Sequence, residues 1–266
     1  MWEIDALRGL LILAVLINHL NITVNEFCIN GIYQIDPFAW AEASDPLHLW
    51  YTIDQSGVLR SADWVLKLRG SCNNLAVDTF FVLSGLSCVF SRNLLKGGFR
   101  LLCGAAFVSL FTWLLAVTTG KEDQFIRFGV LHCYGLCHFI HYFLLEKRSN
   151  QTLLIVAAVV LAAGYYLKYQ PIYTNSALLV PFGIREYGAV QRDYWPVFPM
   201  LGWFLVGVVL GRRFYSQKKS LLPGQSDRKW HRPLCFLGRY SGLIYCGHMV
   251  VYTLVFCGIG HIFGLY

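Results

Sequence analysis

Among the ionisable residues inside the long apolar stretches of this chain are His19, Asp78 and His248. Ionisable side chains in hydrocarbon are costly and usually mark a cavity, a pathway or a catalytic site. A carboxylate can orient an imidazole and raise its basicity, which is what general-base catalysis needs. We therefore predict that His19 acts as a base and that Asp78 orients it. The structural alternative for His19 is a hydrogen-bonded packing residue.

A second group of candidates is basic and lies near the ends of the apolar stretches. Arg8 begins the first stretch and Arg239 begins the last one. Guanidinium groups form bidentate hydrogen bonds with phosphate, so these two arginines are predicted to hold a phosphate-rich cytosolic ligand. The alternative for Arg8 is an i, i+3 ion pair with Asp5 at the start of a helix.

The depth of each candidate along its predicted helix relates the candidates to one another. His19 follows Arg8 by eleven residues, and at the helical rise this is about 16 Å, which places His19 in the outer half of its span. Asp78 of the second predicted span is expected to share this depth. So are Arg127 and His132 at the start of the fourth span, because both spans enter from the outer side. The residues that we place around the substrate are Arg127, His132, His248 and Ser84.

The composition indicates that a lipid bilayer surrounds the protein. Hydrophobic residues make up 56% of the 266 residues and charged residues 14%, against roughly 25% charged in ordinary globular chains. No polar block of domain size interrupts the apolar stretches, so we predict a single membrane-embedded domain over residues 1–266. The first apolar run is expected to stay in the mature protein, because Glu3 and Asp5 precede it instead of a basic segment.

Apolar runs of about 20 residues can cross the hydrocarbon core of a bilayer as helices. The runs predict an all-α, polytopic transmembrane bundle of seven spans, or eight if a segment of the first loop or near 172–184 is also embedded. A long loop, Cys28–Asn74, follows the first span and is predicted to be external. The seven predicted spans are Leu7–Phe27, Leu75–Phe90, Leu101–Thr119, Phe128–Leu145, Thr152–Leu167, Val197–Tyr215 and Leu237–Ile262.

Lysines and arginines predict the orientation, because cytoplasmic loops retain them. The connections after the second, fourth and sixth predicted spans are basic, whereas the stretch from Glu26 to Arg69 has three Lys or Arg against six Asp or Glu. We therefore predict a multi-pass protein of the cell membrane with a cytoplasmic N-terminus and an external C-terminus. The net charge of +7 is then a topology signal, which anionic lipid complements, and indicates no nucleic-acid partner.

The nine cysteines predict no metal centre, because most of them lie in apolar stretches without ligand spacing. A disulfide between Cys28 and Cys72 stays open as an alternative in an oxidising compartment. The sequence contains no P-loop, dinucleotide fingerprint or zinc motif.

Five short blocks follow one another over nearly the whole chain. They are Ile4–Gly9 with His19, Phe80–Ser87, Phe125–His132, Asp193–Gly202 and Leu237–His248. In this order they resemble the motifs of integral-membrane acyltransferases, and in particular the bacterial relatives of heparan-α-glucosaminide N-acetyltransferase. The ordered combination is specific, although no single block is decisive.

The resemblance implies an all-helical membrane enzyme that uses cytosolic acetyl-CoA as co-substrate. It would deliver the acetyl group to an amine or hydroxyl of a sugar or envelope glycan on the external face, with His19 as the base. In the animal enzyme the position of His19 resembles an Asn, and a His in the first luminal loop carries the catalytic proposal. This chain has no His shortly before Asp78, where that residue would fall.

Other readings of the same residues stay open at this point. A transporter or flippase could use intramembrane His, Asp and Arg as a proton-coupled pathway, although the sequence shows none of the inverted repeats typical of that class. An O-acetyltransferase of the O-antigen acetylase branch of integral-membrane acyltransferases would differ in its acceptor and not in its donor. The oligomeric state is open as well, with a homodimer as one alternative.

Overall fold

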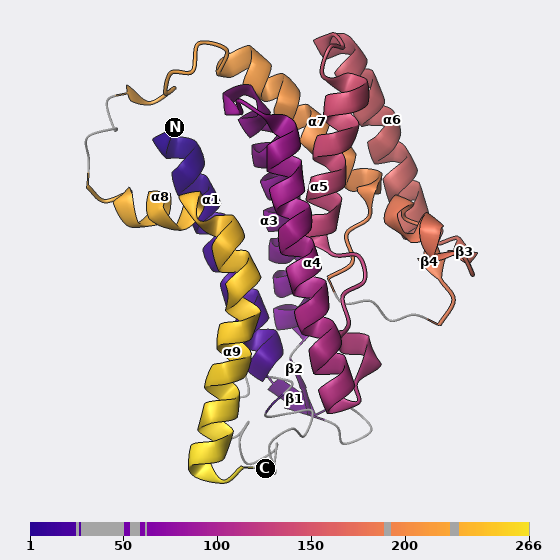
Figure 1. Cartoon of the computed structure of the whole chain (residues 1–266), viewed down its shortest axis with the longest axis vertical. Coiled ribbons are helices and arrows are strands. Elements are labelled where there is room, and N and C mark those ends of the chain that lie inside the picture. The colour runs from indigo at the N-terminus through magenta and orange to yellow at the C-terminus, as the bar shows by residue number, and fades with distance from the viewer. Residues whose placement is uncertain are drawn as a thin grey trace. The chain divides into compact units, whose positions relative to one another are not determined.

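The chain is almost entirely helical in a computed structural model, shown in Figure 1. The structure describes residues 1–24, 27, 51–53, 59–61, 63–188, 193–223 and 229–265, without the side chains of 51–69 and of Asp123. The longer helices are α1 (Trp2–Val24), α3 (Asp63–Ser87), α4 (Leu94–Thr119), α5 (Val130–Ile140), α6 (Asn150–Tyr169), α7 (Val197–Phe214), α8 (Arg232–Arg239) and α9 (Ser241–Phe263). The short elements are β1 (Tyr51–Ile53), β2 (Leu59–Ser61), η2 (Cys88–Phe90), η3 (Glu122–Gln124), η4 (His141–Leu145), β3 (Tyr173–Thr174), η5 (Ala177–Phe182) and β4 (Arg185–Glu186).

The predicted all-α polytopic architecture is confirmed. Within the described residues, six helices are long and apolar enough to cross a membrane. At the position of the predicted fourth span, α5 and the π-helical η4 together form a shorter apolar helix, Val130–Leu145. Each of the seven predicted spans therefore has a helix at its place. The predicted external loop lies mostly outside the described residues, and so does Cys28 of the suggested disulfide.

The start of α3 corrects a predicted boundary. Hydropathy places the second span at Leu75, whereas the helix begins at Asp63. The intervening segment is rich in polar residues and is therefore not recognised as part of a span, but it contains no proline and continues the helix. The amphipathic stretch that ends at Leu68 forms the first turns of α3. The Nδ2 atom of Asn18 in α1 donates to Oδ1 of Asn73 at 3.2 Å, which holds these polar turns against α1.

The described chain divides into two compact units. The first unit comprises Met1–Gly9 and Asp78–Cys246, and the second comprises Leu10–Val77 and Gly247–Tyr266. Each unit is built from helices that are distant in the sequence. The single domain over residues 1–266 stays a prediction.

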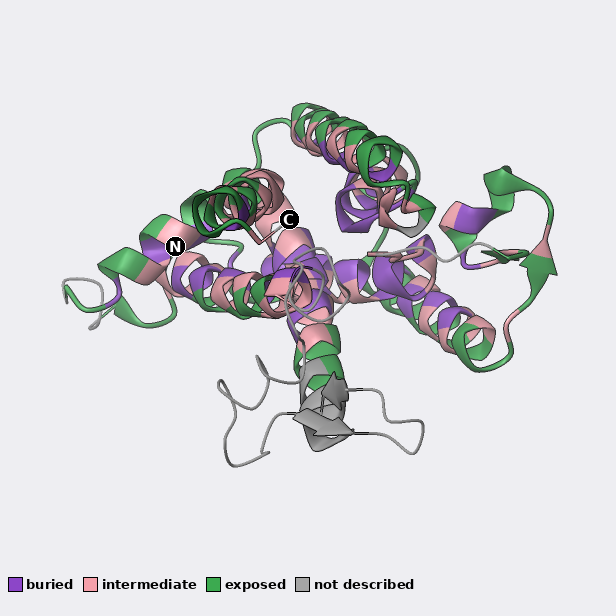
Figure 2. Cartoon of the chain, turned by 90° about the horizontal axis from the view of Figure 1, so that it is seen from below, coloured by how far each residue is buried: buried purple, intermediate pink, exposed green. Residues whose placement is uncertain are grey.

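In the first unit, α4, α5, α6 and α7 alternate in direction, as Figure 1 shows. Side-chain caps begin two of these helices: Asn93 accepts from the backbone N–H of Lys96, and Ser149 accepts from that of Thr152. Buried positions form stripes on the helices, as Figure 2 shows, and many large apolar side chains are exposed. Exposed large apolar side chains are expected on helices that face lipid.

Close backbone contacts join α3 to α7 in the first unit. A side chain at Gly85 would collide with the carbonyl of Phe204, and one at Gly207 would collide with the carbonyl of Val82. In lipid, where the hydrophobic effect does not drive helices together, such small residues allow close van der Waals packing. These two glycines therefore allow the backbones of α3 and α7 to approach each other closely.

In the second unit, α1 and α9 pack side by side and in the same direction. The rings of His19 and His248 are in contact, and so are those of Phe27 and Phe256, with centroids 5.1 Å apart. Both pairs have the same sequence separation of 229 residues, which only parallel segments can keep constant. The unit also contains the antiparallel hairpin of β1 and β2, in which Thr52 lies opposite Arg60.

Candidate functional site

The second unit holds a pair of imidazoles from its two parallel helices. Nδ1 of His19 lies 2.6 Å from Nε2 of His248. The two rings are nearly parallel, with centroids 4.7 Å apart and an interplanar angle of 7°. His248 is 5% exposed. Sequence reasoning placed both residues in the site but did not predict that they contact each other.

Contacts on either side of the imidazole pair fix the two helices. Tyr252 donates from its hydroxyl to the carbonyl of Leu16 at 3.1 Å, one turn before His19. The ring of Tyr252 also meets the ring of His248 edge to face at 5.6 Å. On the adjacent position of α1, Asn18 bonds Asn73 of α3. The polar positions of α1 are thus held by both neighbouring helices of the unit.

Asp78 lies at the start of the first unit, within α3. Lys168, in the last turn of α6, is near enough to act on its carboxyl group electrostatically. The predicted orientation of His19 by Asp78 stays a prediction.

The two candidate phosphate ligands are brought together by one carboxylate in the first unit. Asp5 lies 3.8 Å from Nη1 of Arg8 and accepts from Nε of Arg239 at 3.2 Å. Arg8 also donates to the carbonyl of Leu83 at 3.3 Å and to the hydroxyl of Ser87, both in α3. The i, i+3 ion pair proposed as the alternative role of Arg8 is therefore present. We call Asp5, Arg8 and Arg239 the basic cluster.

The two arginines of this cluster differ in exposure. The side chain of Arg8 is 23% exposed and that of Arg239 is 67% exposed. Two arginines and one aspartate leave the cluster with one uncompensated positive charge at neutral pH. Arg239 is consequently the better placed of the two to reach an anion from solution.

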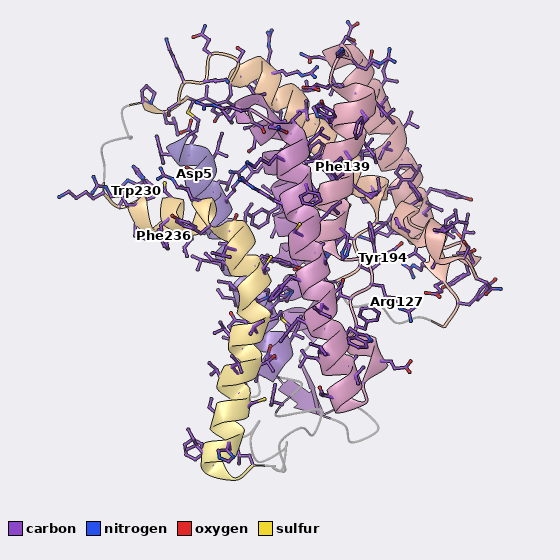
Figure 3. All side chains as sticks on the ribbon, in the orientation of Figure 1. Asp5, Arg127, Phe139, Tyr194, Trp230 and Phe236 are labelled. Carbon is purple, nitrogen blue, oxygen red and sulfur yellow. The ribbon has the colours of Figure 1, made fainter. Side chains whose placement is uncertain are left out.

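Helix α8 presents Arg239 to Asp5 because it packs closely on the first turns of α1. A side chain at Gly238 would collide with the carbonyl of Asp5, so glycine allows the approach. Before α8, the ring of His231 stacks on Trp2 at 4.5 Å, and Trp230 meets Trp2 edge to face. Figure 3 shows Asp5 together with Trp230 and Phe236 of this region. Phe236 is exposed beside the basic side chains, as expected near a membrane–water interface.

The remaining predicted site residues have other partners in the first unit. Arg127 precedes α5 and forms an ion pair with Glu186 of β4 at 3.0 Å. His132 accepts at Nδ1 from the backbone N–H of Gly129 at 3.2 Å, so Nε2 carries its hydrogen when the ring is neutral. Nε2 faces the hydroxyl of Ser109 at 3.5 Å. Ser84 supplies a backbone acceptor to Cys88, while Ser87, one turn later in the same sequence block, bonds Arg8.

Asp193 is a site residue that sequence reasoning missed. Its carboxylate accepts from the hydroxyl of Tyr245 at 2.7 Å, from Nε1 of Trp195 at 2.9 Å and from the backbone N–H of Val130 at 3.3 Å. Its φ of 52° is left-handed, a region in which Asp is enriched among non-glycine residues. The carboxylate lies at the N-terminus of α5, where the helix dipole favours a negative charge. The only signal in the sequence was the block Asp193–Gly202.

Tyr194 holds the loop that carries Asp193. Its hydroxyl donates to the carbonyl of Val180 in η5 at 2.6 Å, and burial raises the pKa of Tyr194 to about 12. The phenol therefore stays protonated and remains a donor at physiological pH. Figure 3 labels Tyr194 and Arg127, which both belong to the first unit.

Comparison with known proteins gives one match. A family model described as heparan-alpha-glucosaminide N-acetyltransferase, catalytic, matches residues 47–250. The match includes Asp78, Ser84, Arg127, His132, Arg239 and His248, and His19 and Arg8 precede it. Neither the curated proteins nor the solved structures give a match.

Proposed function

Because the chain belongs to the family of heparan-alpha-glucosaminide N-acetyltransferase catalytic domains, we propose that it transfers an acetyl group from cytosolic acetyl-CoA to a sugar on the external face. The acceptor would be an amine or hydroxyl of an amino sugar or an envelope glycan. The observation that carries the proposal is the family match, which extends over most of the membrane helices.

The basic cluster supports the donor half of the proposal. Coenzyme A is rich in phosphate, and Arg239 is exposed and shares its carboxylate partner with Arg8. A guanidinium can bind phosphate through parallel hydrogen bonds and keep its charge at any physiological pH. Arg239 would contact phosphate directly. Arg8, held by α3, would position Asp5 and add positive charge.

The imidazole pair supports the chemical half of the proposal. His19 would remove a proton from the acceptor amine or hydroxyl as that group attacks the thioester carbonyl. The carbon–sulfur bond then breaks, the acetyl group remains on the acceptor, and the imidazolium returns the proton to the thiolate of coenzyme A. Holding donor and acceptor together in a water-poor bundle would supply a large share of the rate. Asp78 is proposed from the sequence as the group that orients His19, and His248, which contacts His19, is the alternative.

The parallel packing of α1 and α9 supports the proposed orientation of the termini. Two parallel spans enter from the same face, so the number of crossings from α1 to α9 must be odd. Counting Val130–Leu145 as a crossing gives seven. With the basic connections in the cytoplasm, a reporter fused after Tyr266 is expected outside, and a tag inserted within 216–227 is expected in the cytoplasm. If both positions report the same face, the crossing count is wrong.

The proposed function can be tested with purified protein in nanodiscs. Acetyl-CoA at about 100 times its Kd should stabilise the protein by about 2.7 kcal/mol, which a thermal shift detects. Radiolabelled acetyl-CoA should then give labelled N-acetylglucosamine from glucosamine as the probe acceptor, with CoA release in equal amount. Folded protein that shows no shift with acetyl-CoA would contradict the donor assignment and favour the transporter alternative.

A further inference from the structure

We propose that His248 fixes the tautomer of His19 through a shared proton, so that the base of the acetyl transfer is an imidazole pair. In this arrangement Nδ1–H of His19 donates to Nε2 of His248, and Nε2 of His19 is the nitrogen that takes the proton of the acceptor. His248 is thus a positioning residue. This inference rests on the proposed function and adds to it the residue that sets the active form of the base.

The geometry of the pair allows one proton between the two nitrogens. Nδ1 of His19 and Nε2 of His248 are 2.6 Å apart, a distance at which one nitrogen must donate and the other must accept. If both nitrogens carried hydrogen, the contact would be repulsive. If His248 donated instead, Nε2 of a neutral His19 would carry the hydrogen and could not act as a base. Only the first tautomer is productive.

In the apolar surroundings of His19, a neutral hydrogen-bond partner costs less free energy to bury than a charged one. His248 is 5% exposed and lies within the apolar helix α9. Burying an ionised carboxylate is costly unless several donors compensate its charge. Asp193 illustrates this requirement in the first unit, since its carboxylate accepts three hydrogen bonds. An imidazole can orient another imidazole without such a set of donors.

Tyr252 holds the pair in register. Its hydroxyl bonds the carbonyl of Leu16, one turn before His19, while its ring meets the ring of His248 edge to face. Thr23 bonds the backbone carbonyl of His19 at 2.9 Å, one turn after it. The contact of Tyr252 with Leu16 therefore fixes the register of α9 against α1, and this register holds the two imidazole rings nearly parallel, with an interplanar angle of 7°.

The proton balance of the transfer follows from this arrangement. The acceptor N–H or O–H bond breaks, its proton moves to Nε2 of His19, and the acceptor atom bonds the acetyl carbon. The positive charge on His19 strengthens its Nδ1–H hydrogen bond to His248, because charge-assisted hydrogen bonds are the stronger ones. When the thioester breaks, the proton on Nε2 passes to the sulfur of coenzyme A. Both imidazoles then return to their starting form.

Two variants of His248 separate positioning from packing. His248→Gln keeps an acceptor, Oε1, near the place of Nε2, whereas His248→Leu removes it. A positioned general base contributes about 100- to 10,000-fold, so His248→Leu is expected to lower kcat by about 10- to 100-fold, with the KM for acetyl-CoA unchanged. His248→Gln should recover most of that loss. His261→Leu is the matched control on the exposed end of the same helix and should have no effect.

Proton NMR of protein labelled with nitrogen-15 in histidine provides a readout that does not depend on activity. The wild type should show a strongly downfield proton correlated with one His19 nitrogen, and this signal should be absent from both His19→Ala and His248→Leu. Absence of the signal from the folded wild type would overturn the imidazole pair, and so would equal kcat losses in the Gln and Leu variants. A signal together with full activity of His19→Ala would instead contradict the role of His19 in the proposed function.

Discussion

The basic cluster and the imidazole pair are both built around side chains of α1, yet they satisfy their polar groups in different ways. In the basic cluster, Asp5 pairs with two guanidinium groups, and Arg8 adds bonds to α3. In the imidazole pair, two rings meet through a single short contact and carry no obligatory charge. The first arrangement is built from charged groups, and the second is built from groups that can exchange a proton.

This difference follows from the surroundings of the two sites, because the first turns of α1 lie beside exposed polar groups and its interior lies among apolar ones. The basic cluster involves the first turns of α1 and the short helix α8, where Arg239 is exposed. The imidazoles lie among apolar residues of α1 and α9, and charge in an apolar environment is unfavourable. Fixed charges therefore suit binding of an anion, whereas neutral groups that can be protonated suit proton transfer. The predictions below test this division of roles.

The largest effect is expected from His19→Ala. Removing a general base should lower acetyl transfer by about 100- to 10,000-fold, because the base acts in the transition state. The affinity for acetyl-CoA should change less than twofold, since binding of the donor precedes proton transfer. Transfer of radiolabelled acetyl to glucosamine and a thermal titration with acetyl-CoA measure the two quantities. Near-normal transfer by the variant would remove His19 from the chemistry.

A smaller effect, on stability, is expected from Arg8→Gln. The change removes the charge paired with Asp5 and the bonds to Leu83 and Ser87. A hydrogen bond of a charged group contributes roughly 1.5–3 kcal/mol, so the thermal midpoint in nanodiscs should fall by several degrees. Arg8→Lys keeps the charge but loses the planar guanidinium that contacts Asp5 and α3 together. Its thermal midpoint should lie between those of the wild type and Arg8→Gln. Unchanged stability with a large loss of CoA affinity would make Arg8 a direct phosphate ligand.

Arg239→Gln should show the opposite pattern with a smaller magnitude. Its side chain is 67% exposed, so its removal should leave the thermal midpoint nearly unchanged. Loss of one partly solvated contact to phosphate should raise the Kd for coenzyme A by roughly 3- to 10-fold. Isothermal titration with CoA and with dephosphorylated CoA analogues measures this change. Equal affinities of wild type and variant would exclude Arg239 from the donor site.

The smallest effect is expected from Asp78→Asn. If the carboxyl group only helps to orient His19, the amide keeps part of the hydrogen bonding and transfer should fall by about 3- to 10-fold. The loss should largely disappear in the His19→Ala background, because a positioning residue has nothing left to position. A loss as large as that of His19→Ala would make Asp78 a catalytic group itself.

The helices were predictable from the sequence because a membrane span is a local property. An apolar run of sufficient length, such as that of α4 or α9, needs no knowledge of its neighbours. Polar turns at a helix end break this rule, which is why the span predicted from Leu75 misses the first turns of α3, which begins at Asp63. The short strands β3 and β4 were not predicted, since two residues each give no period to detect.

The partners of the polar residues were less predictable than the residues themselves. His19 and His248 were both recognised as costly intramembrane groups, but their contact depends on the register of two helices that are 229 residues apart. Arg127 was placed near the substrate, yet its ion pair is with Glu186, a residue with no sequence pattern around it. Asp193 lies in a loop outside every apolar run, so its three hydrogen bonds had no local signal.

The parallel contact of α1 with α9 also has a consequence for how the protein is made. During synthesis α1 is among the first helices to enter the bilayer, and α9 follows only after the other spans have been translated. Until then His248 has not been synthesised, and the polar atoms of His19 need other hydrogen-bond partners, from lipid headgroups, water or the insertion machinery. The imidazole pair can therefore form only late in biogenesis, so a nascent chain that stops before α9 would be inserted without this pair.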